Sequence, residues 1–290
     1  MPVLEQDAVL VRMLASGINP SDLIPVTGAY RHRTNIPFVP GFDGVGEIFA
    51  VGEHVDRALI CRRVLPLGSA GNWQTFKAAP ADWCIEVPSD ITDEQAALAY
   101  VNPLTARLLV EALNPQHGDL VGITAAASQI GRMLIRMLSA AGARPLAIVR
   151  SSSALAALHS EAVADVVLEG TDLPVLDAGF DAVGGICGAR LAASIQPGRP
   201  FVHYGLFSGV PLTSALLEGT QASVKLFRLR DWVHSVPRER LRAAMAQVFA
   251  DIRSGRAASV VAAHYPLEEF RTGVAHNAQS GRHGKIILRL

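Results

Sequence analysis

The chain has 290 residues, half of them hydrophobic, and carries 26 Lys and Arg against 26 Asp and Glu. This length and composition allow a large buried core and favour two domains over one. The balanced charge gives no global field that would attract nucleic acid or an anionic membrane, so a charged partner must be recognised locally. No apolar run approaches the roughly 20 residues of a membrane-spanning helix.

The cysteines and the N-terminal segment predict the compartment. Cys61, Cys84 and Cys187 are far apart in the sequence and form no CxxC pair, and the first residues lack the order of a secretion signal. We therefore expect a cytoplasmic protein with reduced thiols.

The pattern of short strands and helices changes near residue 100. Before it, β-rich runs such as DAVLVRML, VGEIFAVG and DWCIEVPSD are separated by Gly, Pro and Asn. After it, helical stretches alternate with the buried runs DLVGIT, PLAIVR, ADVVLEG, FDAVGG and RPFVHYG, an alternation typical of βαβ units. The chain ends with a helical stretch and the strand GKIILRL. We predict an α/β protein in which a parallel-sheet nucleotide domain, 100–233, lies between two pieces, 1–99 and 234–290, of a β-rich domain.

The stretch TAAASQIGRMLIRML, residues 124–138, predicts a phosphate-binding loop between a strand and a helix. Such a loop turns backbone N–H groups and the positive end of the helix dipole toward a pyrophosphate. The usual GxGxxG pattern is reduced to small residues and one glycine, Gly131, which keeps the role of packing the helix against the strand. An ordinary strand–helix turn is the alternative.

The next strand ends AIVRSSS, where an NAD site would carry an acid for the ribose 2′-hydroxyl. Arg150 and the serines after it supply positive charge and hydroxyl donors instead, which suit a 2′-phosphate. The sequence therefore favours NADPH over NADH, with a solvated arginine as the alternative.

Five segments together resemble a known family: SGINPSDLIPVTGAY, GFDGVGEIFAVG, VNPLTA, TAAASQIG and GKIIL. They are similar to the zinc-independent medium-chain dehydrogenases/reductases, closest to the mitochondrial-type 2-enoyl thioester reductases, with quinone oxidoreductases next. The resemblance covers nearly the whole chain. It implies a Rossmann-type doubly wound sheet domain, an irregular β-rich GroES-like domain, and a homodimer.

The resemblance also assigns cofactor contacts. It matches family segments near the cofactor to Asn102, to the loop after the fifth strand of the nucleotide domain, to a segment with an aromatic in close relatives, and to Lys285. Taken with the phosphate loop and the Arg150 region, the expected NADPH contacts are Asn102, Ser128, Gln129, Ile130, Gly131, Arg150, Ser151, Ser152, Tyr204, Gly205, Leu206, Phe207, Phe227, Arg228, Leu229 and Lys285.

The implied reaction is hydride addition to an α,β-unsaturated thioester, followed by protonation of the enolate. By resemblance the acid is Tyr30 in VTGAYRHR, after a turn at Gly28, and His32 is its rival. A phenol, with a pKa near 10, is a competent acid toward an enolate.

The sequence predicts no metal site. Zinc-dependent members of the superfamily carry a Cys just before the segment matching NPSD and a His-Glu pair where this chain has Phe42 and Asp43. Here the first place holds Gly17 and Ile18, and three dispersed cysteines cannot make a structural zinc cluster.

Two departures from the family bear on the substrate site. Members begin with a hairpin of roughly 30 residues before the part matching DAVLVRML, whereas this sequence starts about there, so either its start is truncated or its β domain closes differently. Arg228 replaces an aromatic, and Arg31, His32 and Arg33 follow Tyr30. If these cations face the cleft, they favour an anionic or CoA- or ACP-linked substrate.

The resulting hypothesis is an NADPH-dependent reductase of an activated C=C bond, with a 2-enoyl thioester as substrate. Two alternatives remain: an NADPH quinone oxidoreductase, and a cofactor-binding protein without turnover, as a crystallin-like or RNA-binding relative would be. The absence of a Lys- and Arg-rich run argues against RNA.

Overall fold

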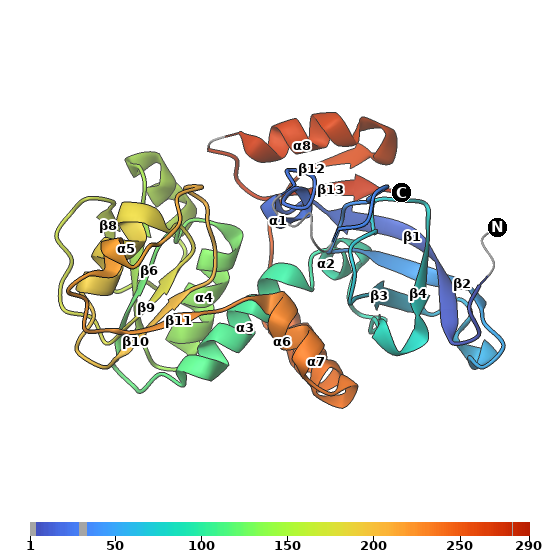
Figure 1. Ribbon diagram of the computed structural model, residues 1–290, viewed down its shortest axis with the longest axis horizontal. Helices are drawn as coiled ribbons and strands as arrows, with labels where there is room; N and C mark the ends of the chain where they lie inside the picture. Colours follow the sequence, from blue (N-terminus) through green and yellow to red (C-terminus); the bar gives the residue numbers. More distant parts are fainter. Residues whose placement is uncertain (1–3, 29–33, 280) are drawn as a thin grey trace. The chain divides into compact units, whose positions relative to one another are not determined.

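The structure is a computed structural model and describes residues 4–28, 34–279 and 281–290. The chain divides into two compact units (Figure 1): Met1–Leu104 with Arg230–Leu290, and Thr105–Leu229. The division predicted from the sequence lies at 99/100 and 233/234. Both boundaries fall near the start of a helix, α3 (Val101–Leu113) and α6 (Leu229–Ser235).

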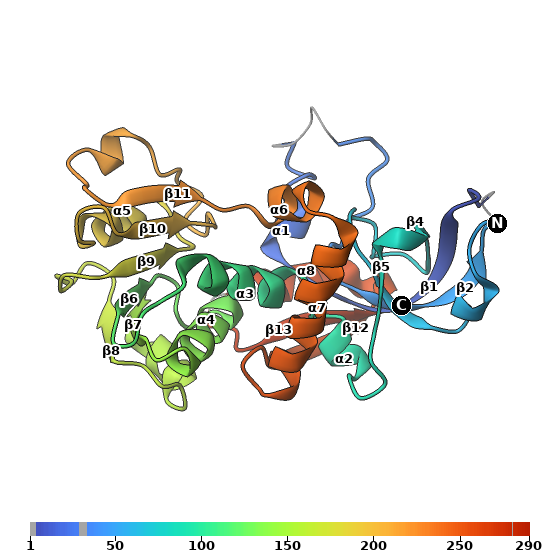
Figure 2. The same ribbon diagram turned by 90° about the horizontal axis from the view of Figure 1, so that it is seen from below.

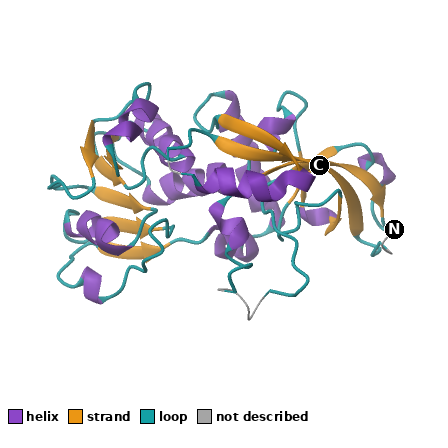
Figure 3. Cartoon of the chain, turned by 90° about the horizontal axis from the view of Figure 1, so that it is seen from above, coloured by secondary structure: helices purple, strands orange, loops and turns teal. Residues whose placement is uncertain are grey.

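The first unit is built on a mainly antiparallel sheet, drawn with orange strands in Figure 3. Among the described residues its strand order is β12-β13-β1-β2-β3-β5, β4 also pairs with β1, and only β12 and β13 run parallel. The strands are β1 (Ala8–Gly17), β2 (Val45–Val51), β3 (Arg63–Pro66), β4 (Phe76–Pro80), β5 (Cys84–Glu86), β12 (Val261–Pro266) and β13 (Lys285–Arg289).

Strand β1 organises this sheet, because it pairs with β2, β4 and β13. Its apolar sequence is buried almost throughout, and Val9, Val11 and Met13 pack against Ile48 and Val64 in one hydrophobic cluster. The remaining helices of the unit are α1 (Pro20–Leu23), α2 (Asp93–Ala96), α7 (Arg238–Arg253) and α8 (Phe270–Ala278). The motif NPSD forms α1 directly after β1, so a rigid strand positions it.

The second unit contains a parallel sheet with the order β11-β10-β9-β6-β7-β8 (Figure 2). The chain leaves β6 for β7 and β8 on one side and then returns to β9 and β10 on the other side. The point between β6 and β9 is therefore the place where the strand order reverses, outside whose carboxyl ends ligands of such sheets bind. The strands are β6 (Leu120–Ile123), β7 (Arg144–Val149), β8 (Asp165–Leu168), β9 (Ala178–Asp181), β10 (Pro200–His203) and β11 (Ser223–Leu226).

Helices α4 (Gln129–Ala140) and α5 (Gly185–Ala193) pack on this sheet, α4 against β7 and α5 against β9. Helix α4 forms because Ser128 caps it and because Ile130, Leu134 and Met137, at helical spacing, are buried. The parallel sheet with its helices and the separate β-rich sheet confirm the predicted fold class. Among the described helices, none is long and apolar enough to cross a membrane.

The loop between β6 and α4 makes its tight turn with one glycine, Gly131, and with an alanine, Ala125, at the other strained position. Ala125 adopts a φ of +49°, the left-handed conformation that glycine usually takes. A β-carbon at Gly131 would lie 2.5 Å from the carbonyl oxygen of Ala126 and 2.7 Å from that of Ala125, so only glycine fits there without a shift. The sequence keeps glycine where close packing demands it, and tolerates alanine where only the backbone angle is unfavourable.

We expect Ala125→Gly to stabilise the second unit by about 0.5–1 kcal/mol, because glycine adopts a positive φ without steric cost. This corresponds to a rise of about 1–5 °C in the midpoint of thermal unfolding, measured by calorimetry. Ala126→Gly is the matched control, since Ala126 is fully buried and its φ is not positive. Ala126→Gly should lower the midpoint of thermal unfolding. An equal fall of the midpoint in both variants would show that the positive φ at Ala125 does not strain the backbone.

Candidate functional site

The start of helix α4 has the geometry of an anion site. The Ser128 hydroxyl accepts a hydrogen bond from the Gly131 N–H at 3.1 Å, and the Ser128 N–H donates to the Ala125 carbonyl at 2.9 Å. These bonds hold the loop tightly against the first turn. The close approach at Gly131 leaves the helix N-terminus at the carboxyl end of β6, where the helix dipole favours a phosphate.

Most of the predicted cofactor residues lie at the same edge of the parallel sheet. Arg150, Ser151 and Ser152 follow β7, the segment Tyr204 to Phe207 follows β10, and Phe227 to Leu229 follow β11. Because parallel strands end at one edge, the sheet brings these loops and the α4 N-terminus together. Arg150 is exposed, and the hydroxyls of Ser151 and Ser153 lie 2.8 Å apart.

Tyr204 is a special case in this set. Its hydroxyl is buried and makes no hydrogen bond within the described residues. Burial, reinforced by the nearby Asp181 carboxylate, raises the pKa of the Tyr204 phenol, so it stays protonated at neutral pH. A buried phenol needs an acceptor. Such an orphan donor, together with the close approach at Gly131, fits a dinucleotide lying along this edge.

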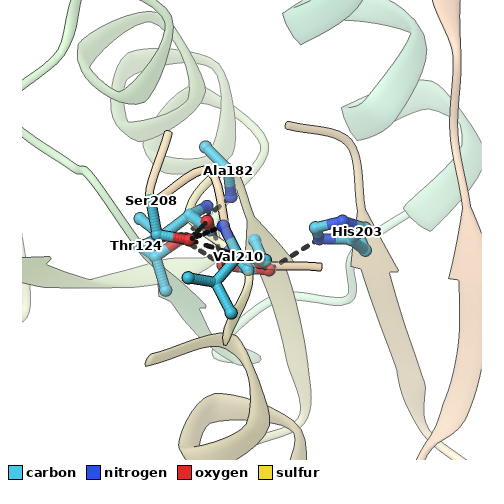
Figure 4. Close-up of polar contacts among 8 residues, drawn as sticks. Thr124, Ala182, His203, Ser208 and Val210 are labelled. Carbon is cyan, nitrogen blue, oxygen red and sulfur yellow. Dashed lines mark hydrogen bonds and ion pairs between the residues drawn. The ribbon is translucent and has the colours of Figure 1, made fainter. Parts of the chain in front are cut away.

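Asp181, at the end of β9, is the main polar residue that sequence reasoning missed. Its carboxylate is fully buried and accepts hydrogen bonds from the Thr124 hydroxyl at 2.7 Å, the Val183 N–H at 3.0 Å and the Gly184 N–H at 3.0 Å (Figure 4). It also pairs with His203 Nδ1 at 2.7 Å. A signal was present in the sequence, since an acid ending an apolar strand in FDAVGG must find several donors.

The Asp181 cluster joins the ends of three strands. Thr124 follows β6, and its hydroxyl oxygen accepts the Ala182 N–H at 2.9 Å while donating to Asp181. His203 ends β10. Ser208 extends the cluster, because its hydroxyl donates to the carbonyl of Val183, the residue whose N–H binds Asp181, at 2.6 Å (Figure 4). The cluster therefore fixes the loops after β9 and β10 at the point where the strand order reverses.

The first unit contains a second buried polar cluster, made of Asn19, Asp22, Asp43 and Lys285. Lys285 Nζ donates to Asn19 Oδ1, and Asn19 Nδ2 donates to Asp43 at 2.8 Å. Asp43 also accepts the Val101 N–H at 2.7 Å, which holds the start of α3 beside it. All four residues of the cluster are buried. Of them, only Lys285 was predicted from the sequence to contact the cofactor.

Inside this cluster Lys285 places a positive charge beside buried acidic side chains. Burial lowers its pKa, and the carboxylates of Asp43 and Asp22 act in the opposite direction. Burial raises the pKa of Asp43, against the effect of Lys285. The Lys285 ammonium compensates the Asp43 carboxylate, which would otherwise be very costly to bury. A contact of Lys285 with the cofactor stays a prediction.

One other predicted position, Asn102, lies at the start of helix α3. Asn102 is the second residue of α3 and is half-buried. Tyr30 and its neighbours Arg31, His32 and Arg33 lie outside the described residues. The segment before them ends in a turn in which Gly28 has a φ of +83° and its N–H donates to the Pro25 carbonyl at 3.2 Å. Glycine is required at that angle, as the sequence suggested for a tight turn.

Possible metal ligands are dispersed in the described part of the chain. No three His, Cys, Asp or Glu side chains there are close enough to hold a metal ion together. Cys61, Cys84 and Cys187 are free thiols. Burial raises the pKa of Cys84 and of Cys187 to about 12, so both remain thiols at neutral pH.

The comparisons with known proteins agree with this architecture. Residues 5–89 match the model of the alcohol dehydrogenase GroES-like domain, and residues 157–288 match that of the zinc-binding dehydrogenase domain. The mitochondrial enoyl-[acyl-carrier-protein] reductase of Xenopus tropicalis is 30% identical over 286 residues, which cover 90% of this chain and 81% of the relative.

Solved structures show the same relationship. A putative NADPH:quinone reductase from Bacillus thuringiensis is 32% identical, with a TM-score of 0.94, over 100% of this chain and 92% of its own. A mycobacterial protein solved in complex with NADPH is 25% identical, with a TM-score of 0.87, over 100% of this chain and 93% of its own. The chain therefore belongs to the medium-chain dehydrogenase/reductase superfamily of oxidoreductases.

The buried cluster in the first unit makes stability depend on pH. Burial is the largest effect on Asp22 and raises its pKa to about 7, against hydrogen bonds from the Asn19 and Phe42 N–H groups. The folded state thus keeps a proton that the unfolded chain has lost above its ordinary pKa near 4. The stability contributed by this proton is present below pH 4 and is lost as the pH rises to about 7.

We expect Asp22→Asn to destabilise the protein more at pH 5 than at pH 8. The amide nitrogen would face one of the two backbone N–H donors, at a cost of about 1–3 kcal/mol. At pH 8 the wild type has lost the stability that protonated Asp22 contributes. The difference in free energy of unfolding between the wild type and Asp22→Asn should therefore be smaller at pH 8 than at pH 5. Urea unfolding at both pH values measures it. Asp172→Asn, at an exposed carboxylate, should have almost the same free energy of unfolding as the wild type at both pH values. A difference between the wild type and Asp22→Asn that grows with pH would show that Asp22 is not protonated in the folded state.

Proposed function

We propose that this protein is an NADPH-dependent reductase of activated carbon–carbon double bonds, and that its substrate is a 2-enoyl thioester carried by CoA or an acyl carrier protein. The observation that carries the proposal is the carboxyl edge of the parallel sheet, where a phosphate loop and a strand ending in Arg150 rather than an acid lie side by side. Relatives named as enoyl reductases, similar over most of the chain, support the choice of substrate.

The residues at this edge would divide the work of holding NADPH. Ser128, Gln129, Ile130 and Gly131 would hold the pyrophosphate at the N-terminus of α4. The N-terminus of α5 is less suitable, because the Asp181 carboxylate already accepts the Val183 and Gly184 N–H groups there. Arg150, Ser151 and Ser152 would bind the 2′-phosphate. The remaining proposed contacts are Tyr204, Gly205, Leu206, Phe207, Phe227, Arg228, Leu229, Asn102 and Lys285.

Bound NADPH would supply the hydride, and the protein would supply the proton. Tyr30 is the proposed acid that protonates the enolate formed by hydride addition to the β-carbon. Arg31, Arg33 and Arg228 would favour an anionic carrier such as CoA, because guanidinium groups bind phosphates in a bidentate manner.

A quinone is the second candidate acceptor. The similarity to the putative NADPH:quinone reductase from Bacillus thuringiensis favours it. Quinone reduction requires no protonation of carbon, so it places no demand on Tyr30. NADPH oxidation measured with crotonyl-CoA, with a simple quinone and without acceptor distinguishes these two reactions from cofactor binding without turnover.

Arg150→Ala should weaken NADPH binding by about 1.5–3 kcal/mol, the value of hydrogen bonds to a charged group, and leave NADH binding nearly unchanged. Fluorescence titration with both nucleotides measures this. Arg144→Ala is the matched control, since Arg144 is an exposed arginine at the opposite, amino end of the same strand. Equal losses for the two nucleotides would show that Arg150 does not bind the 2′-phosphate.

Tyr30→Phe should lower turnover of an enoyl thioester by about 10²- to 10⁴-fold, because it removes the positioned acid and keeps the ring. NADPH affinity, thermal stability and quinone reduction should change little. Steady-state kinetics with both acceptors tests this. A parallel loss of both activities would mean that Tyr30 shapes the pocket, and unchanged activity would assign the proton to His32 or to solvent.

We further propose a homodimer formed through the edge strand β11. All four of its residues are exposed, including Val224 and Leu226, and it ends the sheet. An exposed apolar edge strand favours pairing with a second copy. Val224→Lys should therefore yield a monomer in light scattering, and Val175→Lys, at an exposed valine outside the strands, should not. An unchanged mass for Val224→Lys would reject this interface.

The free, dispersed thiols support a reducing compartment, which we propose is the cytoplasm.

A further inference from the structure

Asp181 and His203 form a pair in which one side chain is buried and the other is partly exposed. The Asp181 side chain is fully buried, but 15% of the His203 side chain is exposed, at the carboxyl end of β10. Among the described residues, the hydrogen bond of the imidazole runs through Nδ1 to Asp181. Its Nε2 is therefore available to a ligand.

The surroundings of Asp181 fix the tautomer of His203. The carboxylate already receives the Thr124 hydroxyl and the N–H groups of Val183 and Gly184, so it acts as an acceptor. A carboxylate in that state can bind Nδ1 only if Nδ1 carries a hydrogen. In the neutral imidazole, the proton then lies on Nδ1 and Nε2 is an acceptor. The structure thus presents a hydrogen-bond acceptor of fixed orientation.

The order of the strands indicates which part of a dinucleotide this acceptor would meet. The phosphate loop follows β6, and Arg150 follows β7 on one side of it. His203 is the last residue of β10, two strands away on the other side, which corresponds to about 10 Å at the usual strand spacing. With the pyrophosphate at α4 and the 2′-phosphate near Arg150, the nicotinamide riboside half extends toward β9 and β10.

The loop after β9 passes beside the imidazole of His203. Gly184 has a φ of +75°, and a β-carbon there would lie 3.5 Å from His203 Cε1 and 2.7 Å from the Val210 carbonyl. The contact with the Val210 carbonyl is what requires glycine here, and the imidazole itself would be met only at ordinary van der Waals distance. The next residue, Gly185, is also a glycine with positive φ.

We propose that His203 Nε2 accepts a hydrogen bond from a hydroxyl or amide N–H of the nicotinamide riboside half of NADPH, and that Asp181 is the positioning residue that holds the hydrogen of the neutral imidazole on Nδ1. This inference rests on the proposed binding of NADPH. It adds a cofactor-binding residue outside the set predicted from the sequence.

The test compares whole and partial ligands by titration calorimetry. His203→Ala should weaken NADPH binding by about 5- to 20-fold, the value of one hydrogen bond, and should change the affinity for adenosine 2′,5′-bisphosphate, which lacks the nicotinamide half, by less than about twofold. His117→Ala is the matched control, because His117 is an exposed histidine near the amino end of β6. It should change neither affinity.

Two further arms identify the donor and the role of Asp181. The 3-acetylpyridine analogue of NADPH has a methyl ketone in place of the carboxamide. If the penalty of His203→Ala persists with it, the donor is a ribose hydroxyl; if the penalty vanishes, the donor is the amide. In Asp181→Asn, the new amide can donate to Nδ1 and move the proton to Nε2, so this variant should lose NADPH affinity like His203→Ala and keep its affinity for the bisphosphate.

Other outcomes overturn the inference. Equal weakening of NADPH and bisphosphate binding in His203→Ala would show that the imidazole only supports the loop. Unchanged NADPH binding would show that Nε2 does not contact the cofactor. A wild-type protein that binds neither ligand would instead refute the proposed function itself, so the two failures are distinguishable.

Discussion

The second unit depends on the burial of a single carboxylate, Asp181. An ion removed from water must be surrounded by donors, and here they come from the ends of β6 and β10 and from the loop that starts α5. Each donor bond also fixes a piece of backbone. The place where the strand order reverses is consequently rigid, and a dinucleotide there would meet loops already held in position. Such preorganisation reduces the entropy lost on binding.

The first unit also buries acidic side chains, and there a larger set of polar residues surrounds them. Asp22 and Asp43 are buried beside Lys285 and Asn19, and Asp22 also accepts the Phe42 N–H. The network continues, because Asn72 donates to the Phe42 carbonyl at 3.0 Å and accepts from Lys77 Nζ at 2.9 Å. Lys77 has no carboxylate partner among its described bonds, and burial lowers its pKa to about 8. The polar residues of NPSD and GFDG thus hold together the strands β1, β4 and β13.

These clusters separate two roles that look alike in a sequence. Lys285 and Asp181 are both charged residues at a strand end, and both are buried. The Lys285 ammonium is engaged with Asn19 inside its own unit. Asp181 holds a partly exposed imidazole whose second nitrogen is available.

The sequence by itself predicted strands β1, β2, β5 and β13 of the first unit and β6 to β10 of the second, because buried strands and amphipathic helices such as α4 have their own periodicity. The strands β3, β4 and β12 were not predicted. The sequence also indicated the glycine that close packing requires at Gly131 and the missing acid beside Arg150. It did not predict β11, since all four residues of that strand are exposed and carry no burial signal. The partnership of Thr124, Asp181 and His203 was likewise decided only by the tertiary structure, because these residues are 57 and 22 positions apart and meet only when parallel strands end at one edge.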